Sequence, residues 1–265
     1  FLKQCVYKSS YRIIAHSNFI KGQLLTHFNI KESAVEVIPH GNFDAHLPEK
    51  TLPVRQARKY LSLRDSDHVL LFFGVIRENK GLDLLLDAFE SASARDEHLK
   101  LLIAGKPQNS KLENLFRTRI SQISKPGRII YHPRFVPVHE VPYYFTAADI
   151  VVLPYRMIYH SGVLHAAFSF ARPVITTNVG DFKEMVIDGL NGYVLGQNTA
   201  VQLAAAIHKA FRDHHELGNM GLCARKTSEQ RFSWPDIAVK TKALYSQTKP
   251  FNAPEVHHVS RIQCR

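Results

Sequence analysis

Short, solid runs of apolar residues constrain this chain of 265 residues more than any other feature. The clearest runs are 69–73, 99–104, 150–154 and 173–176, and a helix-like segment follows each of them. They have the length of strands, and they lack the alternation of apolar and polar residues that is typical of a strand with one solvent-exposed face. Both faces of their sheet must therefore be buried. Helices that connect parallel strands cover a sheet in this way. We therefore expect an α/β fold with a Rossmann-like, doubly wound parallel sheet.

The segment before this series predicts a smaller strand-helix-strand unit over 1–45. Its strands are expected at 11–15 and 35–39, on either side of a helix over 18–28 that Ser17 or Asn18 would cap. A polar stretch at 46–54 is the predicted linker. The expected elements of the main domain, 55–234, are strands at 128–131 and 192–195 besides the four runs above, and helices at 55–61, 82–91, 112–123, 138–147, 162–171, 182–187, 201–211 and 217–230. A helix over 235–248 and a tail with little structure over 249–265 are expected to follow.

Composition and charge exclude several classes of protein. Hydrophobic residues make up 45% and charged residues 22%, which is typical of a folded globular chain. The formal charge of +11 favours anionic partners. The basic residues are scattered, without a polybasic block or a nucleic-acid-binding motif, so we expect no nucleic-acid partner. No apolar run approaches the roughly 20 residues of a membrane-spanning helix.

The three cysteines, Cys5, Cys223 and Cys264, form no CxxC pair, which favours neither a disulfide framework nor a zinc site. A cytoplasmic location is therefore expected. The basic excess also suits acidic lipid headgroups, which leaves open peripheral contact with the inner face of the membrane. Because the chain starts at Phe1, we expect it to begin within a longer protein.

The loop 74–81 is the strongest candidate for a phosphate site. It follows a predicted strand and places Arg77 and Lys80 at the start of the next helix. In an open parallel sheet, ligands bind at the carboxyl ends of strands, where helix N-termini present free amides to anions. A guanidinium fork and an ammonium group there could clamp a diphosphate. The alternative is an ordinary solvated loop.

Two further segments lie at equivalent strand ends. Ser161 and Gly162 are small enough to let a phosphate approach the amides of a helix that begins near Val163, although Ser161 could equally be a simple helix cap. Glu184 lies in the first turn of a later helix, where a carboxylate could accept two vicinal hydroxyls of a ribose. The alternative for Glu184 is a favourable charge at a helix N-terminus and nothing more.

Four stretches, taken together, resemble a known family in order and spacing. They are Phe72-Phe73-Gly74-Val75-Ile76-Arg77-Glu78-Asn79-Lys80-Gly81-Leu82-Asp83-Leu84-Leu85, then Leu101-Leu102-Ile103-Ala104-Gly105, then Ala147-Ala148-Asp149-Ile150-Val151-Val152-Leu153-Pro154-Tyr155, and finally Ser161-Gly162-Val163 through Arg172-Pro173-Val174 to Glu184. Over roughly residues 10–248 the chain resembles the C-terminal half of the GT-B fold, retaining nucleotide-sugar glycosyltransferases of family 4, the glycosyl transferases group 1.

The resemblance implies two Rossmann-like domains that face each other across a cleft. Residues 55–234 would be the nucleotide-sugar-binding domain, and 1–45 the end of a truncated N-terminal domain on the acceptor side. The helix over 235–248 would cross back to that domain. His16 does not match the motif of the family's usual cleft histidine.

The resemblance also implies roles for single residues. Arg77 and Lys80 look like the basic pair that binds the donor diphosphate and neutralises its departure, in the loop that Gly74 opens. The amides of Ser161, Gly162 and Val163 look like those that hold the distal phosphate. Glu184 looks like the ribose-binding carboxylate, and the backbone near Phe135 and Val136 looks like the loop that reads the base.

By this resemblance the protein would be a retaining hexosyltransferase. It would move a sugar from a UDP- or GDP-sugar to a glycan, lipid-linked or small-molecule acceptor, as in polysaccharide biosynthesis, and would need no metal or other cofactor. One departure stands out, because the family's pair of glutamates would fall at Ile158 and Ala166. A non-catalytic nucleotide-sugar-binding or scaffolding module therefore remains an alternative, as does a UDP-sugar epimerase.

Overall fold

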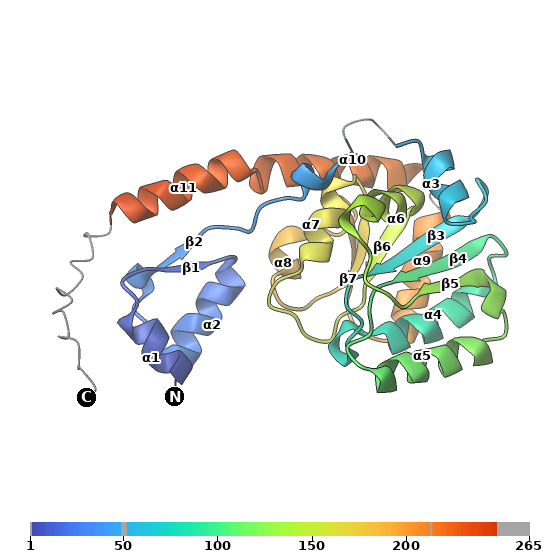
Figure 1. Ribbon diagram of the computed structural model, residues 1–265, viewed down its shortest axis with the longest axis horizontal. Coiled ribbons are helices and arrows are strands. Elements are labelled where there is room, and N and C mark those ends of the chain that lie inside the picture. The colour runs from blue at the N-terminus through green and yellow to red at the C-terminus, as the bar shows by residue number, and fades with distance from the viewer. Residues whose placement is uncertain (1, 49–51, 213, 248–265) are drawn as a thin grey trace, which may run out of the picture.

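The computed structural model describes residues 2–48, 52–212 and 214–247. Its main feature is a six-stranded, fully parallel sheet in the order β5-β4-β3-β6-β7-β8 (Figure 1). Neighbours β3 and β6 are thus not consecutive in the chain, which makes the gap between them the topological switch point of a doubly wound fold. The predicted fold class is confirmed. The strands are β3 (His68–Phe73), β4 (Leu99–Ala104), β5 (Ile129–His132), β6 (Ile150–Leu153), β7 (Val174–Thr177) and β8 (Gly192–Leu195).

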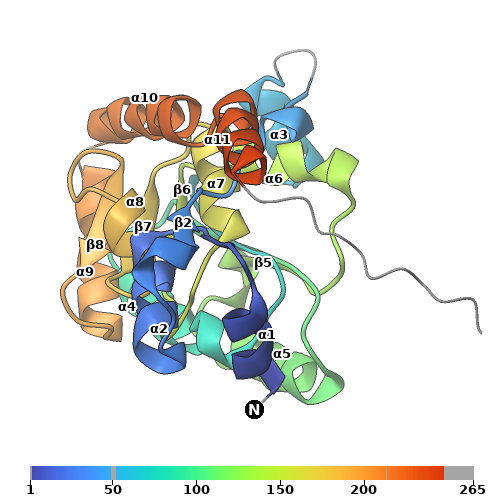
Figure 2. The same cartoon turned by 90° about the vertical axis from the view of Figure 1, so that its left-hand side faces the viewer.

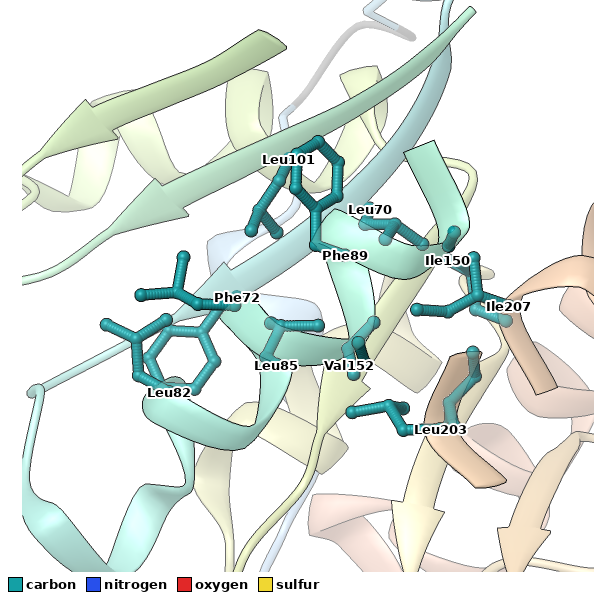
Figure 3. Close-up of a cluster of buried hydrophobic side chains, with 14 of the residues drawn as sticks. Leu70, Phe72, Leu82, Leu85, Phe89, Leu101, Ile150, Val152, Leu203 and Ile207 are labelled. Atoms are coloured by element: carbon teal, nitrogen blue, oxygen red, sulfur yellow. The ribbon is translucent and has the colours of Figure 1, made fainter. Parts of the chain in front are cut away.

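Successive side chains of the central strands enter two different cores, which explains the solid apolar runs. Leu70 and Phe72 of β3 pack with Leu85 and Phe89 from one covering layer (Figure 3). Val69 and Leu71 point to the other face and pack against the second layer. The first layer consists of α4 (Leu82–Ser93), α5 (Ser110–Gln122) and α9 (Ala200–Arg212); the second consists of α3 (Val54–Tyr60), α6 (Val141–Ala147), α7 (Gly162–Ser169) and α8 (Phe182–Met185). Helix α10 (His214–Arg231) contributes to both cores, with Leu217 and Met220 in the first and Ala224 in the second.

The first part of the chain forms a small unit beside the main domain (Figures 1 and 2). Two parallel strands, β1 (Ile13–Ala15) and β2 (Val35–Val37), flank α2 (Asn18–Phe28), as predicted. A preceding helix, α1 (Leu2–Ser9), was not predicted; Tyr7 packs edge-on against Phe28 of α2, with ring centroids 4.8 Å apart. Its formation therefore depends on a contact outside its own sequence.

The last described helix, α11 (Trp234–Ser246), runs back from α10 toward this small unit along one edge of the molecule (Figure 1). The Trp234 indole lies directly over Gly41, where an added Cβ would be 2.1 Å from the ring, and its Nε1 donates to the carbonyl of Asn42 at 2.9 Å. Ile237 and Leu244 of α11 share a core with Ile38. The helix therefore packs on the first unit.

Several element boundaries differ from prediction. Helix α7 ends at Ser169 rather than at 171, because Ala171 adopts a left-handed conformation with φ of 53°. Helix α10 already begins at His214, not at 217. The predicted tail lies outside the described residues, as do 49–51 of the predicted linker. None of the helices in the described ranges has the length and apolarity that a bilayer-crossing segment requires.

Candidate functional site

The loops that follow β3 and β6 meet at the switch point of the sheet. The two strands pair only from Leu70 to Leu71, so their carboxyl ends are free to open into a crevice. Gly81, with φ of 69°, lies so close to the other loop that a Cβ would be 2.0 Å from the carbonyl oxygen of Pro154. Only glycine fits there, since both the conformation and the space exclude a side chain. This contact fixes the position of Lys80, the residue before it.

Lys80 and Arg77 form a basic pair at this crevice. The Lys80 ammonium lies 3.6 Å from the centroid of the Tyr155 ring, which follows β6. Burial, with a smaller contribution from the nearby charge of Arg77, lowers the pKa of Lys80 to about 8. Neither basic group is paired with a carboxylate among the residues the structure describes. Two adjacent cations without a counter-ion are suited to an anionic ligand.

The N-terminus of α7 lies next to this pair. Ser161 is 2% exposed and occupies the N-cap position, yet its hydroxyl accepts no bond from the helix amides. The Ser161 and Tyr155 hydroxyls are neighbours without meeting hydrogen-bond geometry. Gly74, with φ of 98°, closes the other side, where an added Cβ would be 3.1 Å from Cγ2 of Val163. The predicted residues Gly74, Arg77, Lys80, Ser161, Gly162 and Val163 therefore come together.

Glu184 forms hydrogen bonds to the first unit. One carboxylate oxygen accepts from the backbone N–H and the side-chain amide of Asn18, at 3.0 and 3.1 Å, and the other accepts from the N–H of Phe19 at 2.6 Å. Glu184 thus caps the N-terminus of α2, across the boundary between the two units. Three of its roughly four acceptor sites are engaged in these bonds, and the ribose role remains a prediction.

The predicted base-reading loop follows β5, two strands away from β3 in the sheet. Phe135 is 71% exposed, whereas Val136 is buried against the second core. An ion pair between Arg134 and Glu140 spans the loop. The loop and Lys80 thus both follow the carboxyl ends of parallel strands. The base-reading role of the loop remains a prediction.

Two positions at which the family has acidic residues are apolar here. Ala166 is 3% exposed inside α7, and Ile158 packs against the second core. Neither position supplies a carboxylate to the crevice. Among the described residues, no three His, Cys, Asp or Glu side chains are arranged to hold a metal ion.

Sequence reasoning missed several polar and aromatic residues of the crevice. Tyr155 was part of a matching stretch, but nothing in its spacing indicated a contact with Lys80. His40, His160 and His165 come from three places in the chain, and their rings gather with that of His16 beside the N-terminus of α7. Only the position of His160, immediately before the predicted Ser161, could have drawn attention to it.

A basic pair and an uncapped helix N-terminus at the switch point of a doubly wound sheet are the arrangement of α/β proteins that bind phosphate-bearing ligands. A comparison with models of known protein families then identifies the family of this chain. The model of the glycosyl transferases group 1 matches residues 67–213, more than half of the chain. The chain belongs to this family.

Curated relatives agree with this assignment. The chain is 27% identical, over 237 residues, to the D-inositol 3-phosphate glycosyltransferase of Arthrobacter sp. (strain FB24), which covers 88% of this chain and 55% of that protein. It is 36% identical, over 107 residues, to the GDP-mannose:glycolipid 4-beta-D-mannosyltransferase of Xanthomonas campestris, covering 40% of this chain and 29% of the relative. Most of this chain aligns with these D-inositol 3-phosphate glycosyltransferases, but the aligned part is only about half the length of each relative.

Solved structures show the same fold. The structure of Anabaena HepE in complex with UDP-glucose has a TM-score of 0.83 and 18% identity, covering 93% of this chain and 67% of that one. Sucrose-phosphate synthase from Thermosynechococcus elongatus has a TM-score of 0.79 and 22% identity, over 93% of this chain and 60% of that one. Both similarities extend beyond the six-stranded domain to the first unit.

Proposed function

We propose that this chain is the donor-binding part of a glycosyltransferase that transfers a hexosyl group from a nucleoside-diphosphate sugar with retention of configuration. The supporting observation is the position of Lys80, 3.6 Å above Tyr155 and beside the uncapped N-terminus of α7. A diphosphate in this crevice would meet the ammonium, the Arg77 guanidinium and the free amides at the start of α7. Names of relatives that include UDP-glucose and GDP-mannose fit such a donor.

These groups also suit the chemical step of sugar transfer. When the bond between sugar and distal phosphate breaks, negative charge develops on the departing diphosphate. Arg77, Lys80 and the α7 amides would stabilise that charge in the transition state more than in the bound donor. Such cationic and dipolar groups do the work that a divalent ion does elsewhere, so we propose that the reaction needs no metal.

For the acceptor and the cellular location, we propose only a chemical class and a compartment. Relatives named for D-inositol 3-phosphate and for a glycolipid suggest a hydroxyl of a small molecule, glycan or lipid-linked glycan as the acceptor. With a charge of +11, the protein is suited to work in the cytoplasm at the inner face of a membrane that carries acidic lipids.

Calorimetric titration with UDP, GDP and ADP tests the donor site. We expect one nucleotide to bind the chain with micromolar affinity and the variant Arg77→Ala/Lys80→Ala to lose that binding. The matched control, Arg95→Ala/Lys111→Ala, removes two exposed positive charges elsewhere and should bind like the original chain. Equal binding by both variants would refute the assignment of Arg77 and Lys80. Retention is read separately, from the anomeric configuration of the product by NMR.

The apolar residues Ile158 and Ala166 favour a second candidate, a module that binds nucleotide sugar without transferring it. Both functions predict nucleotide binding, so binding does not separate them. Turnover does: a full-length protein that binds the nucleotide tightly but neither hydrolyses nor transfers the sugar would support the module.

A further inference from the structure

Four histidines meet beside the N-terminus of α7. His160 lies with its ring centroid 4.9 Å from that of His165 and 5.1 Å from that of His40. His16 completes the group, at 5.6 Å from His160 and 5.8 Å from His40. His16 and His40 belong to the first unit, and the other two to the main domain. The four-histidine cluster therefore lies where the two units face each other.

Three of these rings are held through the same nitrogen. Nδ1 of His16 lies 3.1 Å from the carbonyl oxygen of Ile38, and Nδ1 of His40 lies 2.7 Å from that of Gly41. Nδ1 of His160 lies 2.9 Å from a carboxylate oxygen of Asp181. Because all three acceptors require a proton on Nδ1, Nε2 is the nitrogen left for a ligand in each ring. A neutral ring would offer a lone pair there, and a protonated ring a donor.

Several buried polar atoms of the cluster have no hydrogen-bond partner in the described part of the chain. His165 is only 1% exposed, and neither of its ring nitrogens is bonded. Nε2 of His160 and Oδ1 of Asp181 are buried and unbonded as well. Unpaired buried polar groups are costly, at roughly 1–3 kcal/mol each. Their concentration in one place, next to an uncapped helix N-terminus, points to a polar ligand.

Charges around the cluster favour an anion as this ligand. Burial, together with the charges of neighbouring histidines, lowers the pKa of His40 and lowers that of His165 well below its usual range. The other charged groups that face the cluster are Asp181, which pairs with His160, and Arg231, whose charge also acts on His165. Glu184, Asp236 and Lys240 line the pocket that His16 shares. Asp181 lies against His160 and Glu184 accepts from the amides of α2, so Arg231, Lys240 and the α7 N-terminus contribute positive potential beside Asp236.

We propose that His16, His40, His160 and His165 bind a phosphate group of a substrate and take up a proton as it binds. The Nε2 atoms would then act as donors to the phosphate oxygens, alongside the amides at the start of α7. The anion would stabilise the imidazolium forms of His40 and His165, which burial and mutual repulsion disfavour in its absence. A shared metal ion is the less suitable occupant, because these described side chains do not converge on one point.

The phosphate could belong to the donor diphosphate or to a phosphorylated acceptor. This assignment of the phosphate to a donor or an acceptor rests on the proposed function, whereas phosphate binding by the cluster does not. His16 also lines a pocket of about 520 Å³ together with Asn18, Glu184 and Arg231, so the cluster can be reached from the cleft between the units. The four-histidine cluster thereby extends the α7 phosphate site toward the first unit.

Inorganic sulfate is a suitable probe, because it remains a dianion between pH 5.5 and 7.0. We would titrate sulfate into the chain at both pH values and observe the imidazole nitrogens by NMR. The proposal predicts that the four cluster histidines shift, and that the affinity falls by up to about 30-fold from pH 5.5 to 7.0 for one linked proton. His160→Gln and His16→Gln/His40→Gln should each lose most of this pH dependence. His139→Gln, at an exposed position, should keep it.

Several outcomes would overturn the proposal: an affinity independent of pH, variants that bind sulfate like the original chain, or shifts that appear with Zn²⁺ but not with sulfate. Titrations at pH 5.5 with UDP or GDP and with UMP or GMP identify the source of the phosphate. Shifts caused by a diphosphate alone would assign the cluster to the donor, whereas sulfate binding at saturating diphosphate would assign it to the acceptor. Sulfate binding without any nucleotide binding would refute the proposed function and leave this inference intact.

Discussion

The N-termini of α2 and α7 lie on opposite sides of the boundary between the two units, and each has a serine at the N-cap. The side chains around the two helix ends differ in charge and in hydrogen bonding. At α2, the Ser17 hydroxyl accepts from the N–H of Ile20 at 3.2 Å, and Glu184 accepts from the N–H groups of Asn18 and Phe19. At α7, Ser161 accepts nothing from the helix amides. Lys80 and the histidines lie beside this end, and the neighbouring carboxylate of Asp181 is paired with His160. The first end is satisfied by its own protein and the second is open to an anion.

This difference teaches that a serine before a helix does not reveal whether the helix end is a cap or a binding site. The distinction depends on which side chains the tertiary structure brings to the free amides. A carboxylate from α8 reaches α2, whereas the loops after β3 and β6 bring Lys80 and Tyr155 to α7. The following predictions test this comparison.

The largest effect is expected from placing a carboxylate at the open end. In Ser161→Asp, the new carboxylate would accept from the α7 amides and repel a diphosphate, so the nucleotide affinity should fall by about 100-fold or more while thermal stability is unchanged or raised. Calorimetry and thermal unfolding measure the two effects. Ser17→Asp, at the closed end, is the matched control and should bind nucleotide normally. An unaltered affinity of Ser161→Asp would contradict an anion site at α7.

The second prediction concerns pH and the cation that faces α7. With a pKa of about 8, Lys80 is charged below pH 8 and neutral above it. Because the charged form binds a diphosphate, the nucleotide affinity should be nearly constant from pH 7.0 to 7.5. It should then fall by up to about tenfold per pH unit above pH 8, until the higher pKa of the bound state is reached.

Lys80→Arg separates this effect from other titrations. The guanidinium remains charged over the whole range, so the fall above pH 8 should disappear. Calorimetric titration from pH 7 to 9.5 measures it. A fall of the same size in Lys80→Arg would show that another group is responsible.

A smaller effect is expected at the closed end. Glu184→Ala removes all three bonds to Asn18 and Phe19, and we expect α2 to lose about 1–2 kcal/mol of local stability. Faster amide hydrogen exchange in 18–28, with unchanged exchange in α7, would show it. The same variant tests the ribose prediction, because a tenfold or greater loss of nucleotide affinity would mean that Glu184 also contacts the donor.

The smallest expected difference lies between the two serines themselves. Ser17→Ala loses a side-chain cap, which costs about 1 kcal/mol, whereas Ser161→Ala loses no such bond and should change stability by only a few tenths of that amount. Chemical denaturation of both variants measures the difference. Equal losses would mean that Ser161 caps α7 after all.

Most of the fold was predictable from the sequence because the burial of its strands is local information. A run such as 69–73 is apolar on both faces wherever it is placed, and only a parallel sheet covered by helices buries it. All eight strands and helix α2 are therefore found within two residues of their predicted bounds. The largest differences are in the first unit, where β1 begins two residues later than predicted, after the exposed Tyr11, and β2 ends two residues earlier. The approximate position of Arg77, Lys80 and Ser161–Val163 at strand ends followed from the same topology.

The sequence by itself determined the doubly wound sheet, the family and the presence of a basic pair at a strand end. The tertiary structure decided which helix N-terminus is open, that Glu184 closes the other, that Tyr155 lies under Lys80 and that four histidines from two units meet. The physical reason is that strands and helices follow from periodic burial along the chain. A charge or hydrogen bond between residues 166 positions apart, as for Asn18 and Glu184, depends on three-dimensional distance, which no local pattern encodes.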